Sequence, residues 1–249
     1  MTRGLCIVTG ASRGIGAATA IAAAKAGWDI AVNYVTNRDA ATQVVNEIRE
    51  CGRKAIAIQA DVAQEVNIMR LFKQAEDELG AITALVNNAG TTGKITRVED
   101  MSSEAMKSVL ELNVLATMIC SREAVRRMST KRGGDGGVIV NVSSISPRIG
   151  GANEFVHYAA SKGAVDVWTV GLAREVAADG IRVNAVAPGM INTELHAAAG
   201  DPERAHRNAP SIPIGRAADP EEVASAIVWL LGDEAGYCAG AILEVSGGR

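Results

Sequence analysis

Several residue types and patterns that mark whole classes of protein are scarce or missing in this sequence. The four cysteines among its 249 residues are scattered without C-x-x-C spacing, so neither a disulfide framework nor a zinc site is expected. The three histidines have no partner at metal-ligand spacing, and no metal site is predicted. Apolar runs stay well short of the roughly 20 residues that span a bilayer. We therefore expect no structural disulfide, no bound metal and no membrane segment.

The charge balance bears on which binding partners are expected. Lysine and arginine number 25 and aspartate and glutamate 28, which gives a formal net charge of −3, and the basic residues are spread along the chain. Neither nucleic acid nor an anionic membrane is therefore an expected partner, whereas a small diffusible ligand is. The N-terminus enters an apolar run directly, without the features of a signal peptide, which predicts a cytoplasmic protein.

The hydrophobic pattern predicts one α/β domain over residues 1–249. With 48% hydrophobic residues the chain can bury a large core, and its length suits a single domain. Short β-rich runs alternate with segments of helical period. The predicted strands are 5–9, 29–34, 55–59, 84–87, 138–142 and 182–187.

The strand runs are continuously apolar rather than alternating, as expected when helices cover both faces of a parallel sheet. Right-handed crossovers then give a doubly wound, Rossmann-type sheet, whose ligand crevice lies outside the carboxyl ends of the strands. Residues 190–216 contain Pro202, Pro210 and Pro213 and lack a sustained hydrophobic period. They are predicted to form a mobile loop that covers the substrate.

A glycine-rich turn follows the first strand and opens the first helix. Its spacing, Gly-x3-Gly-x-Gly, lets the backbone approach a pyrophosphate, while the amides and dipole of the new helix attract the phosphate charge. A glycine-rich turn alone is weak evidence, because it can simply be tight. The cofactor-binding candidates in this turn are Gly10, Ser12, Arg13, Gly14, Ile15 and Gly16.

The end of the second strand bears on the choice of cofactor. Folds selective for NAD place an acidic residue there, on the ribose hydroxyls, whereas this sequence has Tyr34. Without that carboxylate nothing repels a 2′-phosphate, and nearby side chains offer it a cation and donors. These side chains are Arg13, Thr36, Asn37 and Arg38. NADP(H) is therefore the predicted cofactor, with NAD(H) as the alternative.

Tyr158 and Lys162 are four residues apart, hence on one face of a predicted helix. For a tyrosine to exchange protons near neutral pH, its pKa must fall from about 10 to about 7 or 8. A charge about 4 Å away at an effective dielectric near 20 supplies about 4 kcal/mol, so one lysine is sufficient. An isolated pair of this spacing is usually an ordinary helix-surface pair. Here a serine doublet, Ser143 and Ser144, also ends an apolar strand, where one hydroxyl could hold a substrate oxygen.

Several motifs together resemble the classical short-chain dehydrogenase/reductase family over essentially the whole chain. The matching segments are the turn at 9–16, Asp61-Val62, Asn87-Asn88-Ala89-Gly90, Tyr158 to Lys162, Pro188-Gly189 and the region 240–248. The resemblance implies a mainly parallel sheet of about seven strands. It also implies further cofactor contacts, at Asp61, Val62, Asn88, Ala89, Gly90, Pro188, Gly189, Ile191 and Thr193 as well as at Tyr158 and Lys162.

The same resemblance implies a catalytic tetrad of Asn113, Ser144, Tyr158 and Lys162. Tyr158 would be the acid/base, Ser144 would polarise the substrate oxygen, and Lys162 would lower the tyrosine pKa and bind the nicotinamide ribose. Asn113 would hold a water in a proton relay, although on sequence alone it would pass as a helix-kink residue. The spacing from Ser144 to Tyr158 is one residue longer than in many members of the family, which leaves Ser143 as the alternative. Ser144 is preferred because the second serine of this doublet is usually the catalytic one in the family.

The sequence thus predicts an NADP-dependent oxidoreductase that transfers a hydride between nicotinamide and a small carbonyl or alcohol substrate. Polar side chains in the two variable loops suit a sugar or polyol, while a ketone or a 3-ketoacyl thioester stays open; these side chains are Ser146, Asn153, Glu154, Glu194, His196 and Arg204. A non-catalytic dinucleotide-binding sensor or scaffold is the alternative, and an isomerase or dehydratase a smaller one. The resemblance further implies a homotetramer assembled through helices 102–128 and 157–178 and the C-terminal strand.

Overall fold

The computed structural model describes residues 3–249, so the first two residues of the predicted domain lie outside the described residues. A seven-stranded sheet, parallel throughout, runs through the molecule in the order β3-β2-β1-β4-β5-β6-β7. The strands are β1 (Leu5–Val8), β2 (Asp29–Tyr34), β3 (Ala55–Gln59), β4 (Ile82–Asn87), β5 (Gly137–Val142), β6 (Ile181–Pro188) and β7 (Ile242–Val245). The predicted doubly wound fold is confirmed, and the strand order reverses direction between β1 and β4.

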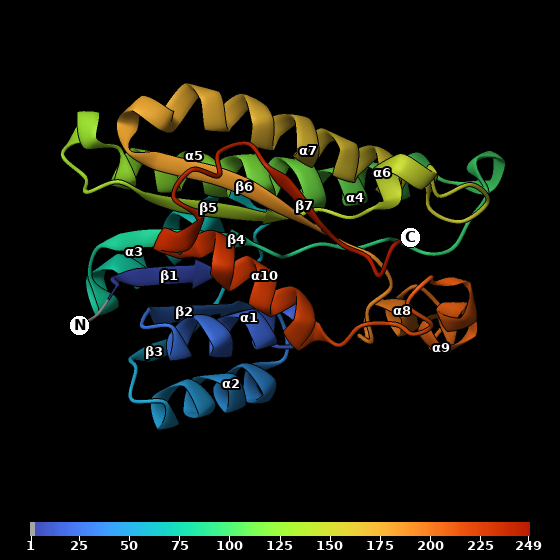
Figure 1. Ribbon diagram of the computed structural model, residues 1–249, viewed down its shortest axis with the longest axis horizontal. Coiled ribbons are helices and arrows are strands. Elements are labelled where there is room, and N and C mark those ends of the chain that lie inside the picture. Colours follow the sequence, from blue (N-terminus) through green and yellow to red (C-terminus); the bar gives the residue numbers. More distant parts are fainter. Residues whose placement is uncertain (1–2) are drawn as a thin grey trace.

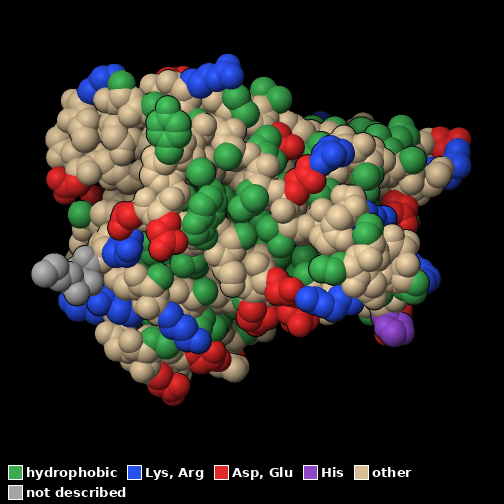
Figure 2. All heavy atoms as spheres, in the orientation of Figure 1, with side chains coloured by type: hydrophobic (Ala, Val, Ile, Leu, Met, Phe, Trp, Pro, Cys, Tyr) green, Lys and Arg blue, Asp and Glu red, His purple; other side chains and the backbone are tan. Residues whose placement is uncertain are grey.

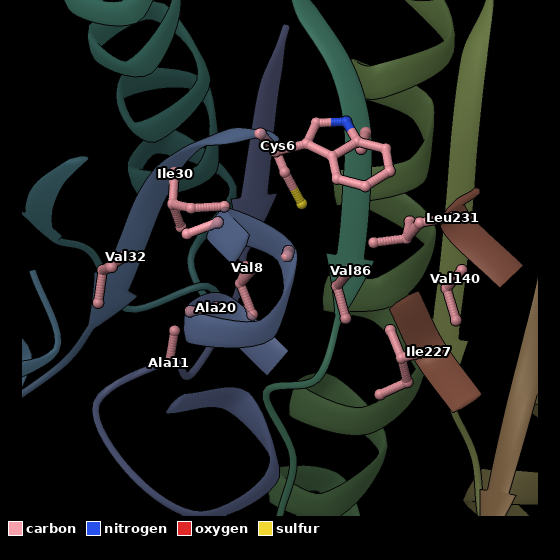
Figure 3. Close-up of a cluster of buried hydrophobic side chains, with 14 of the residues drawn as sticks. Cys6, Val8, Ala11, Ala20, Ile30, Val32, Val86, Val140, Ile227 and Leu231 are labelled. Carbon is pink, nitrogen blue, oxygen red and sulfur yellow. The ribbon is translucent and has the colours of Figure 1, made fainter. Parts of the chain in front are cut away.

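Helices cover both faces of this sheet, as Figure 1 shows. One face carries α1 (Gly14–Lys25), α2 (Arg38–Glu50) and α10 (Pro220–Leu231), and the other carries α3 (Glu65–Leu79), α5 (Ala116–Met128) and α7 (Val156–Val176). Successive strand residues alternate between the two cores. In β1, Cys6 and Val8 pack towards α1 and α10, whereas Leu5 and Ile7 pack towards the opposite helices (Figure 3). Two cores explain why runs such as Cys6-Ile7-Val8 and Val138-Ile139-Val140 are apolar at successive positions.

The helix starts carry local signals that agree with the fold. The side chain of Asn37 accepts a hydrogen bond from the amide of Ala40 and caps α2. At α10, Asp219 and Glu222 form a reciprocal capping box, with Pro220 at the first helical position. These caps fix where the two helices leave the loops at the ligand-binding edge.

The predicted helix at 102–128 is built from three pieces. α4 (Ser103–Leu110) runs into a π-helical turn, Glu111–Leu115, which runs into α5. Asn113 lies in that turn, and turns of this kind mark a local irregularity in a helix. The expectation that Asn113 sits at an irregular point of a helix is confirmed.

Residues 190–216, predicted to be a mobile loop that covers the substrate, contain short helices that the sequence pattern did not indicate. They contain α8 (Leu195–Ala198), α9 (Arg204–Asn208) and a short 3-10 helix, Ala209–Ser211, and they lie beyond the carboxyl ends of the strands (Figure 1). A small apolar cluster of their own, made with one residue that follows them, holds them together: Met190, Ala205, Ile212 and Ala217. Single-turn helices are too short to leave a hydrophobic period, which is why the pattern missed them.

Within residues 3–249, no helix combines the length and the apolar character needed to cross a membrane. The cytoplasmic location predicted from the N-terminus stays a prediction.

Candidate active site

A cavity of about 430 Å³ opens at the carboxyl edge of the sheet, across the β1–β4 reversal. The turn after β1, the ends of β2 and β4, the end of β5 with α7, and the segment after β6 all contribute to it. The predicted site residues that line it are Gly10, Ser12, Arg13, Gly14, Ile15, Tyr34, Thr36, Val62, Asn88, Ala89, Gly90, Ser144, Tyr158, Lys162, Pro188, Gly189, Ile191 and Thr193. Four predicted positions do not line it: Gly16, Arg38, Asp61 and Asn113.

The glycine-rich turn fits a pyrophosphate in its backbone geometry. Gly10 and Gly14 have φ of +62° and +53°, which favours glycine at both positions. A methyl group at Gly16 would lie 2.4 Å from the carbonyl oxygen of Gly10, so α1 can start this close to the turn only with glycine there. Among the described residues no side chain caps the start of α1, which leaves its first amides available to an anion.

Two asparagines hold this turn in place. The Nδ2 of Asn88 donates to the carbonyl oxygens of Thr9 and Gly10, at 2.9 and 3.0 Å. Asn33, from the buried strand β2, accepts a hydrogen bond from the amide of Gly10 at 3.1 Å and donates to the carbonyl of Ala60 at 2.9 Å. Sequence reasoning missed Asn33. The sequence feature that could have identified it is an amide side chain directly after the apolar run Ile30-Ala31-Val32 of a buried strand. A buried polar group without a hydrogen-bond partner destabilises the fold, so such a residue is expected to have one.

The adenosine end of the cavity carries no acid from β2. Tyr34 ends that strand, and Thr36 and Asn37 follow it on the cavity wall, opposite Arg13. The carboxylate of Asp61 accepts a hydrogen bond from the amide of Ala63 at 3.0 Å, within its own loop. The residues present therefore fit a dinucleotide, and the lining near Tyr34 includes the polar side chains of Thr36 and Asn37 and no acidic residue of β2.

Tyr158 and Lys162 face the other end of the cavity from the first turns of α7. Lys162 is 5% exposed; its Nζ donates to the carbonyl oxygen of Val142 at 2.6 Å and lies 5.8 Å from the centre of the Tyr158 ring. Burial lowers the pKa of Lys162 to about 8, against the opposing charge of Asp166.

The structure corrects the expectation that Lys162 leaves Tyr158 with a lowered pKa. Burial raises the pKa of Tyr158 above its usual value, and a hydrogen bond with Ser144 offsets only part of that rise. The sequence argument set the ammonium charge about 4 Å from the phenol and omitted desolvation. In the folded chain Lys162 donates to Val142, and the partly buried Tyr158 phenol loses water that would stabilise its anion.

The two serines after β5 have different partners. The hydroxyl of Ser144 hydrogen-bonds with Tyr158 and lies 2.9 Å from the hydroxyl of Ser146. The hydroxyl of Ser143 donates instead to Oδ1 of Asp166, at 2.5 Å. Of the pair, Ser144 is therefore the serine that faces the tyrosine.

Asn113 is fully buried and its amide is bonded on both sides. Its Oδ1 accepts from the amide of Thr91 at 2.9 Å, and its Nδ2 donates to the carbonyl of Thr91 and to the hydroxyl of Ser161, at 2.8 and 3.0 Å. These bonds tie the π-helical turn to the loop after β4 and to α7. A role for Asn113 in holding a water stays a prediction.

Only two of the six polar residues assigned to the substrate line the cavity, Glu194 and His196. Glu154 and Arg204 are paired with each other by two 2.6 Å hydrogen bonds, and Arg204 also stacks over the ring of Phe155, 5.0 Å from its centre. This pair fastens α9 to the loop before α7. Thr91, Leu112, Leu195 and Ala198 also line the substrate end and were not predicted, because nothing in their spacing marks them.

Comparisons with known proteins agree with this geometry. A family model described as enoyl-(acyl carrier protein) reductase matches residues 10–249. An uncharacterised oxidoreductase of Escherichia coli, YgfF, is 48% identical over 98% of this chain and 99% of its own length. Glucose 1-dehydrogenase 2 of Bacillus subtilis is 36% identical over 100% of this chain and 95% of its own, and a 3-oxoacyl-[acyl-carrier-protein] reductase of Synechocystis is 37% identical over 100% and 97%.

Solved structures show the same fold. A short-chain type dehydrogenase/reductase from Mycobacterium marinum has a TM-score of 0.92 at 34% identity, covering 99% of this chain and 95% of that one. A 7α-hydroxysteroid dehydrogenase, complexed with NADH and a 7-oxo bile acid conjugate, has a TM-score of 0.91 at 34% identity, covering 99% and 94%.

Proposed function

Because the chain belongs to the short-chain dehydrogenase/reductase family, we propose that it is an NADP-dependent oxidoreductase acting on a small carbonyl or alcohol substrate. The observation that carries this proposal is the cavity itself. The turn at one end fits a dinucleotide pyrophosphate, and Ser144, Tyr158 and Lys162 meet at the other end.

The roles of these side chains follow from their environments. When bound, the nicotinamide supplies or accepts the hydride. A phenol with a raised pKa keeps its proton near neutral pH, so Tyr158 is suited to donate that proton to a carbonyl oxygen as negative charge develops there. Ser144, hydrogen-bonded to the phenol, holds the same oxygen, and the buried Lys162 ammonium stabilises the phenolate as it forms.

The test of this mechanism is Tyr158→Phe assayed with NADPH and NADH against sugars, ketones and acyl thioesters. We expect turnover to fall by about 100-fold or more, since general acid catalysis is removed, while the cofactor still binds. Tyr237→Phe makes the same chemical change at an exposed tyrosine and should keep full activity. Unchanged turnover in Tyr158→Phe refutes the mechanism, and cofactor binding without turnover of any compound by the wild type favours a sensor or scaffold.

The cofactor proposal rests on the acid-free end of β2 and on Arg13 across the cavity from it. A ligand at 100 times its Kd stabilises the fold by about 2.7 kcal/mol, which raises the Tm of a chain this size by several degrees. NADPH should therefore raise the Tm more than NADH at equal concentration. In Arg13→Ala the NADPH shift should fall to the NADH level; a larger shift with NADH in the wild type contradicts NADP preference.

A hydroxylated substrate, such as a sugar or polyol, is the proposed class. Glu194 and His196 support it, because both are polar and both line the substrate end. Nε2 of His196 lies 2.9 Å from the carbonyl oxygen of Ile191, so it must carry the proton, and burial lowers the pKa of this histidine. The ring is then neutral with Nδ1 as an acceptor for a hydroxyl. The ketone and thioester arms of the panel test the competing classes.

A homotetramer is the proposed assembly. Large apolar side chains remain exposed on the predicted assembly elements, helices 102–128 and 157–178 and the C-terminal strand, and also on α10 and just before β7. They are Leu115, Val167, Trp229, Tyr237 and Ile242, at the π-helical turn, on α7, on α10, before β7 and on β7. Figure 2 shows hydrophobic side chains gathered in the middle of the face that carries α10 and β7.

A further inference from the structure

We propose that Ser143 and Asp166 form a positioning pair that fastens the Lys162 turn of α7 to the end of β5 and places a negative charge one helical turn from Lys162. The inference rests on the proposed function of this site, which needs a charged lysine beside Tyr158. Ser143 was the alternative to Ser144 in the predicted tetrad and lines the cavity, whereas Asp166 was not predicted; the pair acts through Lys162.

The first observation is a partly buried hydrogen bond between the end of β5 and α7. Ser143, which follows β5 directly, is 2% exposed, and its hydroxyl donates to Oδ1 of Asp166 at 2.5 Å. Asp166 lies four residues after Lys162, one turn further along α7. A hydroxyl bound to a carboxylate is among the stronger side-chain hydrogen bonds, so this contact fixes the helix against the strand end.

The second observation is that Lys162 is fastened to the adjacent residue of the same strand. Its Nζ donates to the carbonyl of Val142 at 2.6 Å. One helical turn is thus held at both of its ends, by Lys162 on Val142 and by Ser143 on Asp166. This double attachment limits how far the ammonium can move relative to Tyr158.

The third observation concerns charge. Tyr158 and Asp166 lie on the same face of α7 as Lys162. The end of β5 contributes the carbonyl of Val142 and the hydroxyl of Ser143. The side-chain amide of Asn113 lies beside Gly90, near the Lys162 ammonium. Asp166 is the only carboxylate in this set. Burial lowers the pKa of Lys162 to about 8, and the charge of Asp166 opposes that fall. Without Asp166 the amine would lose its proton at a lower pH.

The pair also explains why the serine doublet has two distinct members. Burial leaves the pKa of Asp166 above its usual value, and the hydrogen bond from Ser143 and the charge of Lys162 offset part of that rise. Ser143 serves Lys162 through Asp166, and Ser144 serves Tyr158 directly.

Two variants separate the two parts of the pair. Asp166→Asn removes the charge and keeps an acceptor for Ser143, while Ser143→Ala removes the hydrogen bond and keeps the carboxylate. Asp77→Asn is the matched control, since Asp77 also follows a lysine, Lys73, by four residues, but in an exposed pair on α3.

The direct readout is the titration of Lys162 by NMR in protein labelled with carbon-13 at the lysine side chains, with the signal assigned by its loss in Lys162→Met. The wild type should titrate near pH 8. In Asp166→Asn the transition should fall by about one pH unit, in Ser143→Ala it should lie between the two, and in Asp77→Asn it should not move. A wild-type titration in Asp166→Asn, or in Ser143→Ala, overturns the proposal.

Turnover supplies a second readout that distinguishes this proposal from the proposed function. The alkaline limb of the turnover–pH profile should move to lower pH in Asp166→Asn, with KM nearly unchanged. If the wild type turns over no compound in the panel, the oxidoreductase proposal fails, while the Lys162 titration still decides the positioning pair.

Discussion

The addition of one methyl group at Gly16 should weaken cofactor binding while the chain still folds. A Cβ there would lie 2.4 Å from the carbonyl of Gly10 and 2.5 Å from Nδ2 of Asn88, both of which shape the phosphate turn. We expect Gly16→Ala to displace the turn and weaken NADPH binding by about tenfold or more, as measured by titration of the cofactor's fluorescence.

The control for this substitution is Gly163→Ala, also within a helix. Its added Cβ would make only an ordinary contact, 3.8 Å from Pro147, and alanine favours the helix by up to about 1 kcal/mol. Cofactor affinity should stay at the wild-type value there. Equal affinities in the wild type and Gly16→Ala would show that the turn does not hold the pyrophosphate.

At this scale the sequence predicted the residues whose type is dictated by local backbone geometry. The glycines of the turn and the Tyr158–Lys162 spacing are local features, and the structure places them on one cavity. Asn33 and Asp166 were not predicted from the sequence. Each acts through a partner 23 residues away in the sequence, and no local pattern reveals such a partner. The pKa of Tyr158 was misjudged for a related reason, since burial is a property of the whole fold.

Among the helices, α5 contains a buried carboxylate whose contribution to stability can be tested. Glu123 is 1% exposed and is contacted by three arginines of its own helix, Arg122, Arg126 and Arg127. Arg122 and Arg127 also pair with Glu65 and Glu76 of α3, so the network joins two helices. Burial by itself raises the pKa of Glu123, but hydrogen bonds from Arg127 and Arg122 outweigh it and leave the pKa lowered.

We expect Glu123→Gln to lower the free energy of unfolding by about 3 kcal/mol at pH 7, because it removes one partner of a buried ion network. The folded-state pKa lies below the unfolded value of about 4.3, so this stabilisation is complete above that value and is lost as the pH falls through the folded pKa. Urea unfolding of the wild type and of Glu123→Gln at pH 7 and at pH 4 measures the loss of stability at neutral pH and its decrease in acid.

The exposed pair Lys73–Asp77 on α3 provides the comparison for Glu123. Asp77→Asn should cost at most about 1 kcal/mol at either pH, as is usual for surface pairs. A Glu123→Gln penalty that is no larger, or that persists undiminished in acid, would mean that the network contributes little.

Among the elements, those long enough to show a period were predicted, and the short ones were not. The apolar runs located six strands, and their continuous character indicated a sheet covered on both sides, which the two cores confirm. α8 and α9 have 4 and 5 residues, and α9 is held by the cluster around Met190 and by the Glu154–Arg204 pair. Such contacts exist only after the segment has folded onto the domain.

For the whole molecule, two groups of exposed apolar side chains bear on assembly, Leu115 and Val167 at the π-helical turn and on α7, and Trp229 and Ile242 on α10 and β7. Two different self-complementary interfaces are what a tetramer with three twofold axes requires. The wild type should therefore sediment as four chains of 25.8 kDa.

Each group can be disabled separately by a buried charge. Val167→Glu, at a position 75% exposed on α7, should leave dimers joined through β7, and Trp229→Glu should leave dimers joined through α7, because an unpaired carboxylate in an apolar interface costs several kcal/mol. The double variant should be monomeric. Val66→Glu, equally exposed at 74% but on α3, belongs to neither group and should remain tetrameric. Sedimentation velocity distinguishes these species, and a monomeric wild type, or a tetrameric double variant, would show that neither group joins the chains.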